Sequence, residues 1–199
     1  MDHYVTPQRT AQTLHAGHNL DYLDAESVLA LGVKHPVLVM PRVSRLAPEV
    51  LDRLAAYVRG GGKIIAVGST PSMAPGYLDA ARISAQVALA AKTLFAPGAN
   101  VQLVPDDGAV GAALGRALAP DFRVAAPAAD IGFVRRQLRD ADIYFIANTG
   151  NKAVDTTATP GVRRAHAAWL DPHSGSLTRA PAGADLPLSL APYASRVPV

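Results

Sequence analysis

The chain has 199 residues, no cysteine and a formal net charge of +3. Apolar residues make up 49% of it and charged residues 18%, which is enough apolar material for a packed core, so disorder is not expected. The absence of cysteine excludes disulfides, thiolate metal sites and a cysteine nucleophile.

The positive charge does not indicate a nucleic-acid partner. The densest basic cluster is Arg135, Arg136 and Arg139, and it stands beside Asp140 and Asp142. A nucleic-acid binder concentrates its Lys and Arg on one face or in one run. No apolar run reaches the ~18–20 residues that cross a bilayer, and the first ten residues lack the pattern of a signal peptide. We therefore expect neither nucleic-acid binding nor a membrane span, while localisation and oligomeric state stay open.

The N-terminal residues carry a helix-start signal. Thr6 is suited to be an N-cap and Pro7 to be the first helical residue, and Gly17 suits the end of that helix. Residues 19–23 then alternate apolar and polar side chains, which predicts a short strand.

A βαβ pattern follows. Asp24 predicts the cap of a helix through Leu31. Residues 37–40 and 63–67 are apolar runs of the kind that form buried parallel strands, and residues 48–59 repeat apolar side chains at helical spacing between them. We expect the two strands to be adjacent and parallel, with the helix packed on one face of the sheet.

Two glycine-containing segments could be taken for ligand loops. Gly60–Gly62 follows a helix and precedes a strand, which is the wrong order for a phosphate loop, so we interpret it as a helix stop. Residues 68–76 follow a strand and precede a helix, at the sheet edge where ligands tend to bind. They lack the glycine spacing and the lysine of nucleotide-binding loops, so a structural connector is the more ordinary interpretation.

Helix and strand signals continue to residue 118. Residues 78–94 are helical in pattern, residues 101–104 predict another strand, and Asp106 or Asp107 can cap a helix to Leu118. Residues 1–125 therefore predict an α/β domain with an open, mostly parallel sheet and flanking helices.

The pattern changes near residue 125. Residues 125–129 predict a linker, and residues 131–138 and 143–147 predict two strands joined by a turn at 139–142. Tyr144 and Ile146 should share one face of the hairpin, and Ile143, Phe145 and Ala147 the other. We expect Phe145 to point inward, because a large aromatic side chain gains most from burial.

Short strand signals recur to the C-terminus. They fall at residues 154–159, 165–170, 176–179 and 186–190, and Asp171–Gly175 is a strong turn signal. Residues 126–199 therefore predict an antiparallel β segment that forms part of a β-sandwich.

The residues that could carry chemistry each have a simpler explanation. His15 and His18 could share a helix face as metal ligands, but Gly17 between them and the lack of a third ligand argue against it. Trp169 could stack on a sugar ring or belong to the core. A glycosidase needs two carboxyls across the scissile bond, whereas Asp106 and Asp107 suit helix capping, and Asp140 and Asp142 suit a turn. We therefore predict no catalytic, metal-binding or cofactor-binding residue and no cofactor.

Several segments in order resemble a known family of enzymes. Residues 19–24 and 35–76 look like the glutamine-amidotransferase-like α/β domain found inside large glycoside hydrolases. Residues 133–148, 169–175 and 188–195 resemble the hairpin, the Trp-Asp-Pro turn and the Pro-Tyr strand of the α-L-rhamnosidase-like family, with Leu170 as an insertion in the turn.

This resemblance implies carbohydrate as the partner of a much longer protein. In that family the catalytic carboxylates belong to a preceding (β/α)8 barrel, which needs more than 199 residues, so no catalytic residue is carried over. The leading hypothesis is a non-catalytic fragment that scaffolds the barrel. The alternatives are a stand-alone carbohydrate-binding or assembly module, and a small α/β enzyme that uses residues 68–76.

Overall fold

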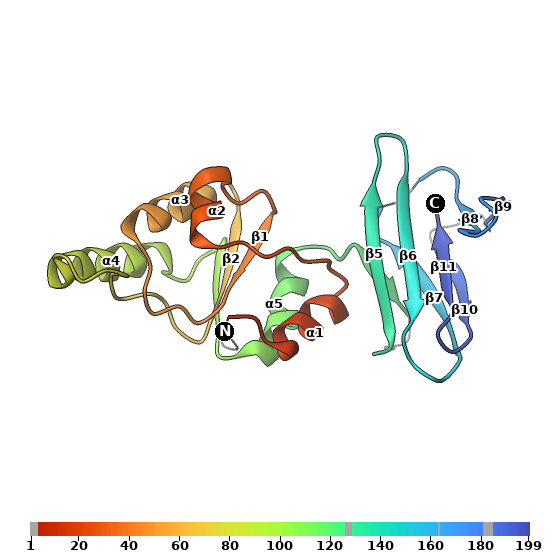
Figure 1. Ribbon diagram of the computed structural model, residues 1–199, viewed down its shortest axis with the longest axis horizontal. Helices are drawn as coiled ribbons and strands as arrows, with labels where there is room; N and C mark the ends of the chain where they lie inside the picture. Colours follow the sequence, from red (N-terminus) through yellow and green to blue (C-terminus); the bar gives the residue numbers. More distant parts are fainter. Residues whose placement is uncertain (1–3, 126–128, 163, 181–184) are drawn as a thin grey trace. The chain divides into compact units, whose positions relative to one another are not determined.

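A computed structural model describes residues 4–125, 129–162, 164–180 and 185–199. The chain forms two compact units (Figure 1). Unit 1 comprises the N-terminal residues up to Thr13 and residues 20–118, and unit 2 comprises residues 14–19 and 119–199. The predicted linker lies partly outside the described residues, at 126–128, and the predicted domain boundary at residue 125 stays a prediction.

Unit 1 is an α/β structure with one small sheet. Strands β1, β2 and β3 pair in that order, and both pairs are parallel. The prediction that residues 37–40 and 63–67 are adjacent parallel strands is therefore confirmed. The elements in chain order are α1 (Pro7–His15, whose last residues belong to unit 2), α2 (Ala25–Leu31), β1 (Val37–Met40), α3 (Pro48–Arg59), β2 (Lys63–Val67), α4 (Ala80–Leu94), β3 (Val101–Val104), η1 (Asp107–Ala109) and α5 (Val110–Ala117).

Both faces of β2 are covered. Ile64 and Ala66 join a core cluster with Leu51 and Leu54 of α3, which confirms that this helix packs on one face. Ile65 and Val67 are also buried, and because side chains alternate along a strand they point to the opposite face. Helix α5 contacts all three strands of the sheet. Burial on both faces explains the continuous apolar sequence of β2.

The predicted helix ends form as the sequence indicates. The amide of Arg9 donates to Oγ1 of Thr6 at 3.1 Å, and the amide of Ser27 donates to Asp24 at 2.8 Å. Gly60 and Gly61 end α3, where the Gly60 amide donates to the carbonyl of Ala56.

The strand predicted at residues 19–23 does not form. Instead, the side chain of Asn19 bonds the backbone of β5 (Ile131–Gln137) in unit 2. Asn19 Nδ2 donates to the Phe133 carbonyl, and the Arg135 amide donates to Asn19 Oδ1, both at 2.9 Å. One amide side chain thus supplies the hydrogen bonds that a strand would have supplied, and it covers part of an open sheet edge.

Unit 2 consists of two antiparallel sheets. One has the strand order β10-β7-β4 and the other β5-β6-β11-β8-β9. Together with the parallel sheet of unit 1, this confirms the predicted fold class. The sequence analysis missed β4. The strands are β4 (Phe122–Val124), β5, β6 (Asp142–Asn148), β7 (Val154–Pro160), β8 (Ala168–Leu170), β9 (Leu177–Arg179), β10 (Leu186–Leu190) and β11 (Ser195–Pro198).

The hairpin of β5 and β6 corrects two predictions. Asp142 lies in β6 opposite Gln137, and the Leu138 amide donates to the Ala141 carbonyl, so the turn lies one residue earlier than predicted. The two faces contain the predicted residues, but the inward face is the one with Tyr144, which is 3% exposed. Phe145 is 45% exposed, so the prediction that it points inward was wrong.

The core of unit 2 is shared by side chains from both of its sheets. Phe122 stacks on Phe133 with ring centroids 4.8 Å apart, and Ile146 and Leu188 complete the contact. Gly17 fits against the start of β4, with a φ of +83° and its carbonyl accepting from the amide of Phe122. A side chain at Gly17 would clash with the Phe122 carbonyl, so this position requires glycine.

Candidate functional site

Unit 1 has a polar cluster where its parallel strands end. Asp107 follows β3, and its carboxylate accepts hydrogen bonds from Thr6 at 2.5 Å and from Arg9 at 2.6 and 2.9 Å. Burial would raise the pKa of Asp107, but the hydrogen bonds from Thr6 and Arg9 and the nearby charges of Arg9 and Arg42 hold that pKa below its usual value. Asp107 is therefore ionised and neutralised, which leaves it no proton to donate at neutral pH.

A shallow hollow of about 280 Å³ adjoins this cluster. Its lining includes Arg42, which follows β1, and Val67, the last residue of β2. This is the sheet edge at which open α/β folds commonly bind ligands. Asp106 also lines the hollow and caps Ala109, which confirms the capping role predicted for it.

The loop at residues 68–76 has a structural role in the described fold. The amides of Ser72 and Met73 both donate to the carbonyl of Ser44 at 3.1 Å, and the amide of Leu46 donates to the carbonyl of Met73. Arg45 donates to the carbonyl of Ala74 at 2.7 Å. These backbone amides are directed at another loop, so they are not available to cradle a ligand.

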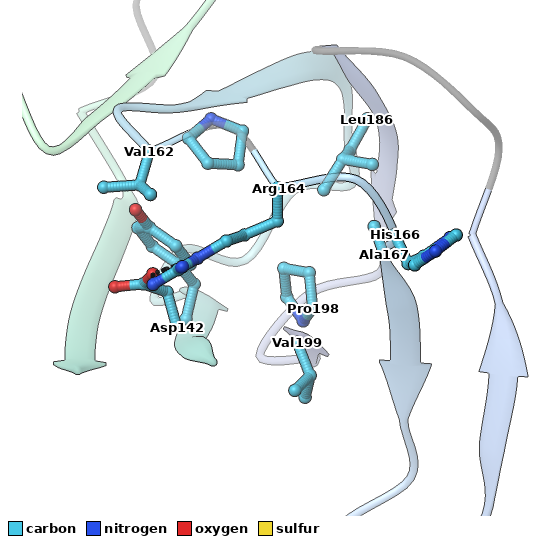
Figure 2. A pocket seen from close by; sticks show the side chains of 10 residues that line it. Asp142, Val162, Arg164, His166, Ala167, Leu186, Pro198 and Val199 are labelled. Atoms are coloured by element: carbon cyan, nitrogen blue, oxygen red, sulfur yellow. Dashed lines mark hydrogen bonds and ion pairs between the residues drawn. The ribbon is translucent and has the colours of Figure 1, made fainter. Parts of the chain in front are cut away.

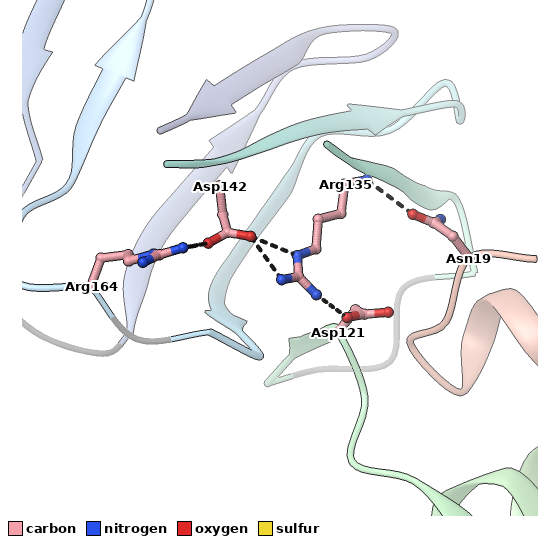
Figure 3. Close-up of polar contacts among 5 residues, drawn as sticks. All are labelled: Asn19, Asp121, Arg135, Asp142 and Arg164. Carbon is pink, nitrogen blue, oxygen red and sulfur yellow. Dashed lines mark hydrogen bonds and ion pairs between the residues drawn. The ribbon is translucent and has the colours of Figure 1, made fainter. Parts of the chain in front are cut away.

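Unit 2 holds a second polar cluster, centred on Asp142 (Figure 3). Arg135 donates to its Oδ1 from Nε at 3.0 Å and from Nη2 at 2.7 Å, and Arg164 donates to its Oδ2 from Nε at 2.9 Å and from Nη2 at 2.6 Å. Arg135 also donates from Nη1 to Asp121 at 2.5 Å. The Asp142 side chain is 3% exposed, whereas that of Arg164 is 44% exposed.

The charges of this cluster balance. Two carboxylates face two guanidinium groups, so the net charge of the four side chains is zero. Burial would raise the pKa of Asp142, but the hydrogen bonds and charges of Arg135 and Arg164 hold it below its usual value. Asp142 is therefore an ionised, fully bonded carboxylate, and it cannot serve as a general acid at neutral pH.

A pocket of about 210 Å³ lies beside Asp142 and Arg164 (Figure 2). The Arg164 side chain runs along the pocket towards Asp142, and His166 lies at its other side. The remaining lining is mostly apolar and comes from Tyr144, Pro160, Val162, Ala167, Leu186, Pro198 and Val199.

Among the described lining residues, Tyr144 places a buried hydroxyl beside this pocket. Its hydroxyl is buried and makes no well-formed hydrogen bond, although the backbone of Val162 lies near it. Burial raises the pKa of Tyr144, which keeps the phenol protonated and able to donate. The Arg135 guanidinium lies 6.0 Å from the centre of its ring.

The histidines that the sequence singled out do not come together as a metal site. His15 is exposed, whereas His18 is 4% exposed and its Nε2 has no hydrogen-bond partner. Burial lowers the pKa of His18, and the charge of Asp121 opposes that shift in part. Across the residues that the structure describes, no group of three metal-binding side chains forms.

The remaining candidate residues lie in a surface ion pair, a turn and a strand. Asp140 is exposed beside Arg139, and Asp171 accepts from the His173 amide and the Ser174 hydroxyl within the predicted turn. Trp169 is half-buried in β8, opposite Thr178. The sequence analysis missed the pairing of Asp142 with Arg164, whose 22-residue separation gives no local signal.

No helix of the described residues is long and apolar enough to cross a membrane.

Residues 10–181 match the family model of alpha-L-rhamnosidase, glycoside hydrolase family 106. A protein of Formosa agariphila named "Putative beta-glucuronidase" is 32% identical over 119 residues, which are 59% of this chain and 10% of that protein.

Two solved structures share the fold at low sequence identity. A rhamnosidase from Novosphingobium sp. PP1Y matches with a TM-score of 0.64 and 22% identity over 82% of this chain and 17% of that one. Gan42B, a GH42 beta-galactosidase of G. stearothermophilus, matches with a TM-score of 0.59 and 11% identity over 96% of this chain and 35% of that one. The chain thus spans about a tenth to a third of the length of these proteins.

Proposed function

Because this chain belongs to the alpha-L-rhamnosidase family of glycoside hydrolases, we propose that it is a non-catalytic part of such an enzyme, which scaffolds a catalytic (β/α)8 barrel. The match with this chain covers 17% of the rhamnosidase that shares its fold, which leaves ample length there for a separate barrel. Carbohydrate is then the substrate of the whole enzyme.

The observation that carries this proposal is the state of Asp107 and Asp142, the carboxylates at the centres of the two polar clusters. Glycoside hydrolysis requires one carboxyl group that is protonated and a second that faces the sugar. Asp107 and Asp142 are both ionised and both hydrogen-bonded to arginine. They also lie in different units, each with its own hydrogen-bond network. Neither carboxylate fits the role of the acid, so the chain is better suited to support than to catalysis.

An exposed apolar surface supports the scaffolding role. On the outward face of the β5–β6 hairpin, Val134 lies directly opposite Phe145, and they are 44% and 45% exposed. Leu138, at the turn, is 53% exposed. We call these three residues the hairpin face. Exposed apolar side chains that are neighbours in a sheet commonly mark contact surfaces, and the scaffolded barrel would cover them.

The first test is activity. The purified 199-residue chain should release no nitrophenol from p-nitrophenyl α-L-rhamnoside above the buffer rate, because neither Asp107 nor Asp142 suits the role of the acid that hydrolysis needs. Release that is abolished by Asp106→Ala or Asp107→Ala would place a complete active site in unit 1 and refute the proposal. The intact mass of the native protein is an independent check, since a native mass of 20.7 kDa would contradict a part of a longer enzyme.

A stand-alone carbohydrate-binding module is the second candidate, and the pocket beside Tyr144 favours it. Sugar binding by a native protein of this size would support that function. The same binding within a longer native enzyme would be compatible with the scaffolding function.

A further inference from the structure

We propose that the pocket of unit 2 binds one neutral sugar ring, with the Tyr144 hydroxyl as a hydrogen-bond donor to the ligand. The pocket is walled by Tyr144, Pro160, Val162, Leu186 and Pro198 beside the Asp142–Arg164 pair. The choice of a sugar rests on the carbohydrate part of the proposed function. The size, charge and donor requirements come from the pocket itself.

The size of the pocket limits the ligand. Drug-sized ligands occupy pockets of about 300–1,000 Å³, and one water in the liquid takes about 30 Å³. The 210 Å³ pocket therefore has the volume of about seven waters. That volume suits a single small ring.

The charges around the pocket select a neutral ligand. Asp142 is already paired with both Arg135 and Arg164, and Arg135 also pairs with Asp121. An anionic ligand would have to compete with Asp142 for Arg164, whose Nε and Nη2 are both bonded to that carboxylate. A neutral ligand leaves this balance undisturbed. The mostly apolar walls suit the C–H face of a sugar ring.

Tyr144 supplies the second, independent observation. Its side chain is 3% exposed and its hydroxyl lacks a formed hydrogen bond. A buried polar group without a partner loses its hydrogen bonds to water and gains none in the fold, so folded proteins rarely keep one without a reason. A phenylalanine at position 144 would remove that cost and preserve the ring that packs near Phe122. A ligand oxygen that accepts from the hydroxyl accounts for the presence of tyrosine.

The test compares sugar binding and stability in the 199-residue chain. L-Rhamnose and, separately, D-glucose are titrated into the ¹⁵N-labelled chain, and the amide shifts of Val162, Arg164 and Ala167 are followed. Saturable shifts confined to the pocket are expected for at least one of the sugars. Tyr144→Phe should weaken that binding about 5- to 10-fold, the effect of one lost hydrogen bond. Its urea midpoint should be unchanged or higher.

Tyr193→Phe is the matched control. It removes a hydroxyl from a tyrosine that is 73% exposed and does not line the pocket, so binding should be as in the unmodified chain. Sugar binding by Tyr144→Phe at full strength would overturn the donor role. The absence of pocket shifts at 50 mM of either sugar would overturn the binding site. Neither result touches the scaffolding proposal, which fails separately if the chain hydrolyses the aryl rhamnoside.

Discussion

Replacing Asp142 with asparagine should destabilise unit 2 strongly, because one carboxylate holds two guanidinium groups. In Asp142→Asn, one oxygen still accepts from one arginine. The new amide instead presents N–H groups to the other arginine, and the cluster gains a net positive charge. Arg135 keeps its bond to Asp121, whereas Arg164 loses its only two hydrogen bonds to a carboxylate.

The size of the effect follows from burial. Breaking a buried ion pair by removing one partner costs about 3–5 kcal/mol. We reduce this to about 2–3 kcal/mol, because the Arg164 side chain is 44% exposed and can regain water. That loss corresponds to a roughly 30- to 150-fold change in the unfolding constant. With a urea dependence of about 1 kcal/mol per M for a small unit, the midpoint should fall by about 2–3 M.

Trp169 provides the assay. It is the only tryptophan and lies in β8, so its fluorescence in urea reports on unit 2. Asp140→Asn is the control, since Asp140 is 83% exposed in its pair with Arg139 and should change the free energy of unfolding by less than about 0.5 kcal/mol. If Asp142→Asn also changed the free energy of unfolding by less than about 0.5 kcal/mol, the assignment of a stabilising role to the cluster would be wrong.

The pH dependence gives a second check on Asp142. Its pKa is lower in the folded state than in the unfolded state, so its stabilisation is fully present above the unfolded value of about 3.9. That stabilisation is lost as the pH falls through the folded-state pKa. The stability gap between the unmodified chain and Asp142→Asn should therefore be constant from pH 8 to 5 and narrow below about pH 4.

Two further predictions concern His18 and Phe145. Because burial lowers the pKa of His18, the unfolded state binds its proton first, and the free energy of unfolding should fall as the pH drops from about 7.5 to 5. His18→Asn should flatten this slope, which is at most about 1.4 kcal/mol per pH unit, in urea unfolding followed by Trp169 fluorescence. If the proposed barrel covers the hairpin face, Phe145→Asp should lower the thermal midpoint of the full-length enzyme by more than Leu177→Asp does, since Leu177, which is exposed on β9, lies outside that face. Equal effects in calorimetry would argue against the proposed contact.

Strong local signals allowed much of unit 1 to be predicted. The apolar runs of β1 and β2 are separated by an amphipathic helix that begins at Pro48 and ends at Gly60, so burial, helix start and helix stop agree. The strand prediction for residues 19–23 was wrong because alternation of apolar and polar residues alone does not form a strand. A strand also needs a partner strand, and here the Asn19 side chain forms the hydrogen bonds to the backbone of Phe133 and Arg135.

The inward face of the hairpin could not be determined from the sequence. Both faces of β6 carry large apolar side chains, so the size argument for Phe145 competes with the pair Tyr144 and Ile146. The register decides between them, because Asp142 opposite Gln137 brings Phe133 and Ile146 opposite each other on the core side. A register depends on the whole sheet, including strands far along the chain.

The Asp142 cluster could not be predicted from the sequence either, because it too depends on the strand register. An aspartate next to a turn has a local explanation, and only the observed register places Asp142 diagonally from Arg135 on the core side of the sheet. Arg164 comes from a segment after β7, and its position depends on how the strands of the second sheet are ordered. A signal was nevertheless present, since opposite charges at diagonal positions of a predicted hairpin often pair.

The inward face of β6 carries three polar side chains, Asp142, Tyr144 and Asn148, and they differ in whether the fold supplies their hydrogen-bond partners. Asn148 is 2% exposed and donates to the carbonyls of Lys152 and Ala191 at 2.7 and 3.0 Å, while its oxygen accepts from the Gly150 amide. Asp142, on the same face, accepts four hydrogen bonds from two arginines. Both side chains are therefore fully accounted for by folding. Tyr144 lies between them in the strand and lines a pocket, and its hydroxyl makes no well-formed hydrogen bond, although the Val162 backbone approaches it; this free donor is the basis of the proposed ligand contact.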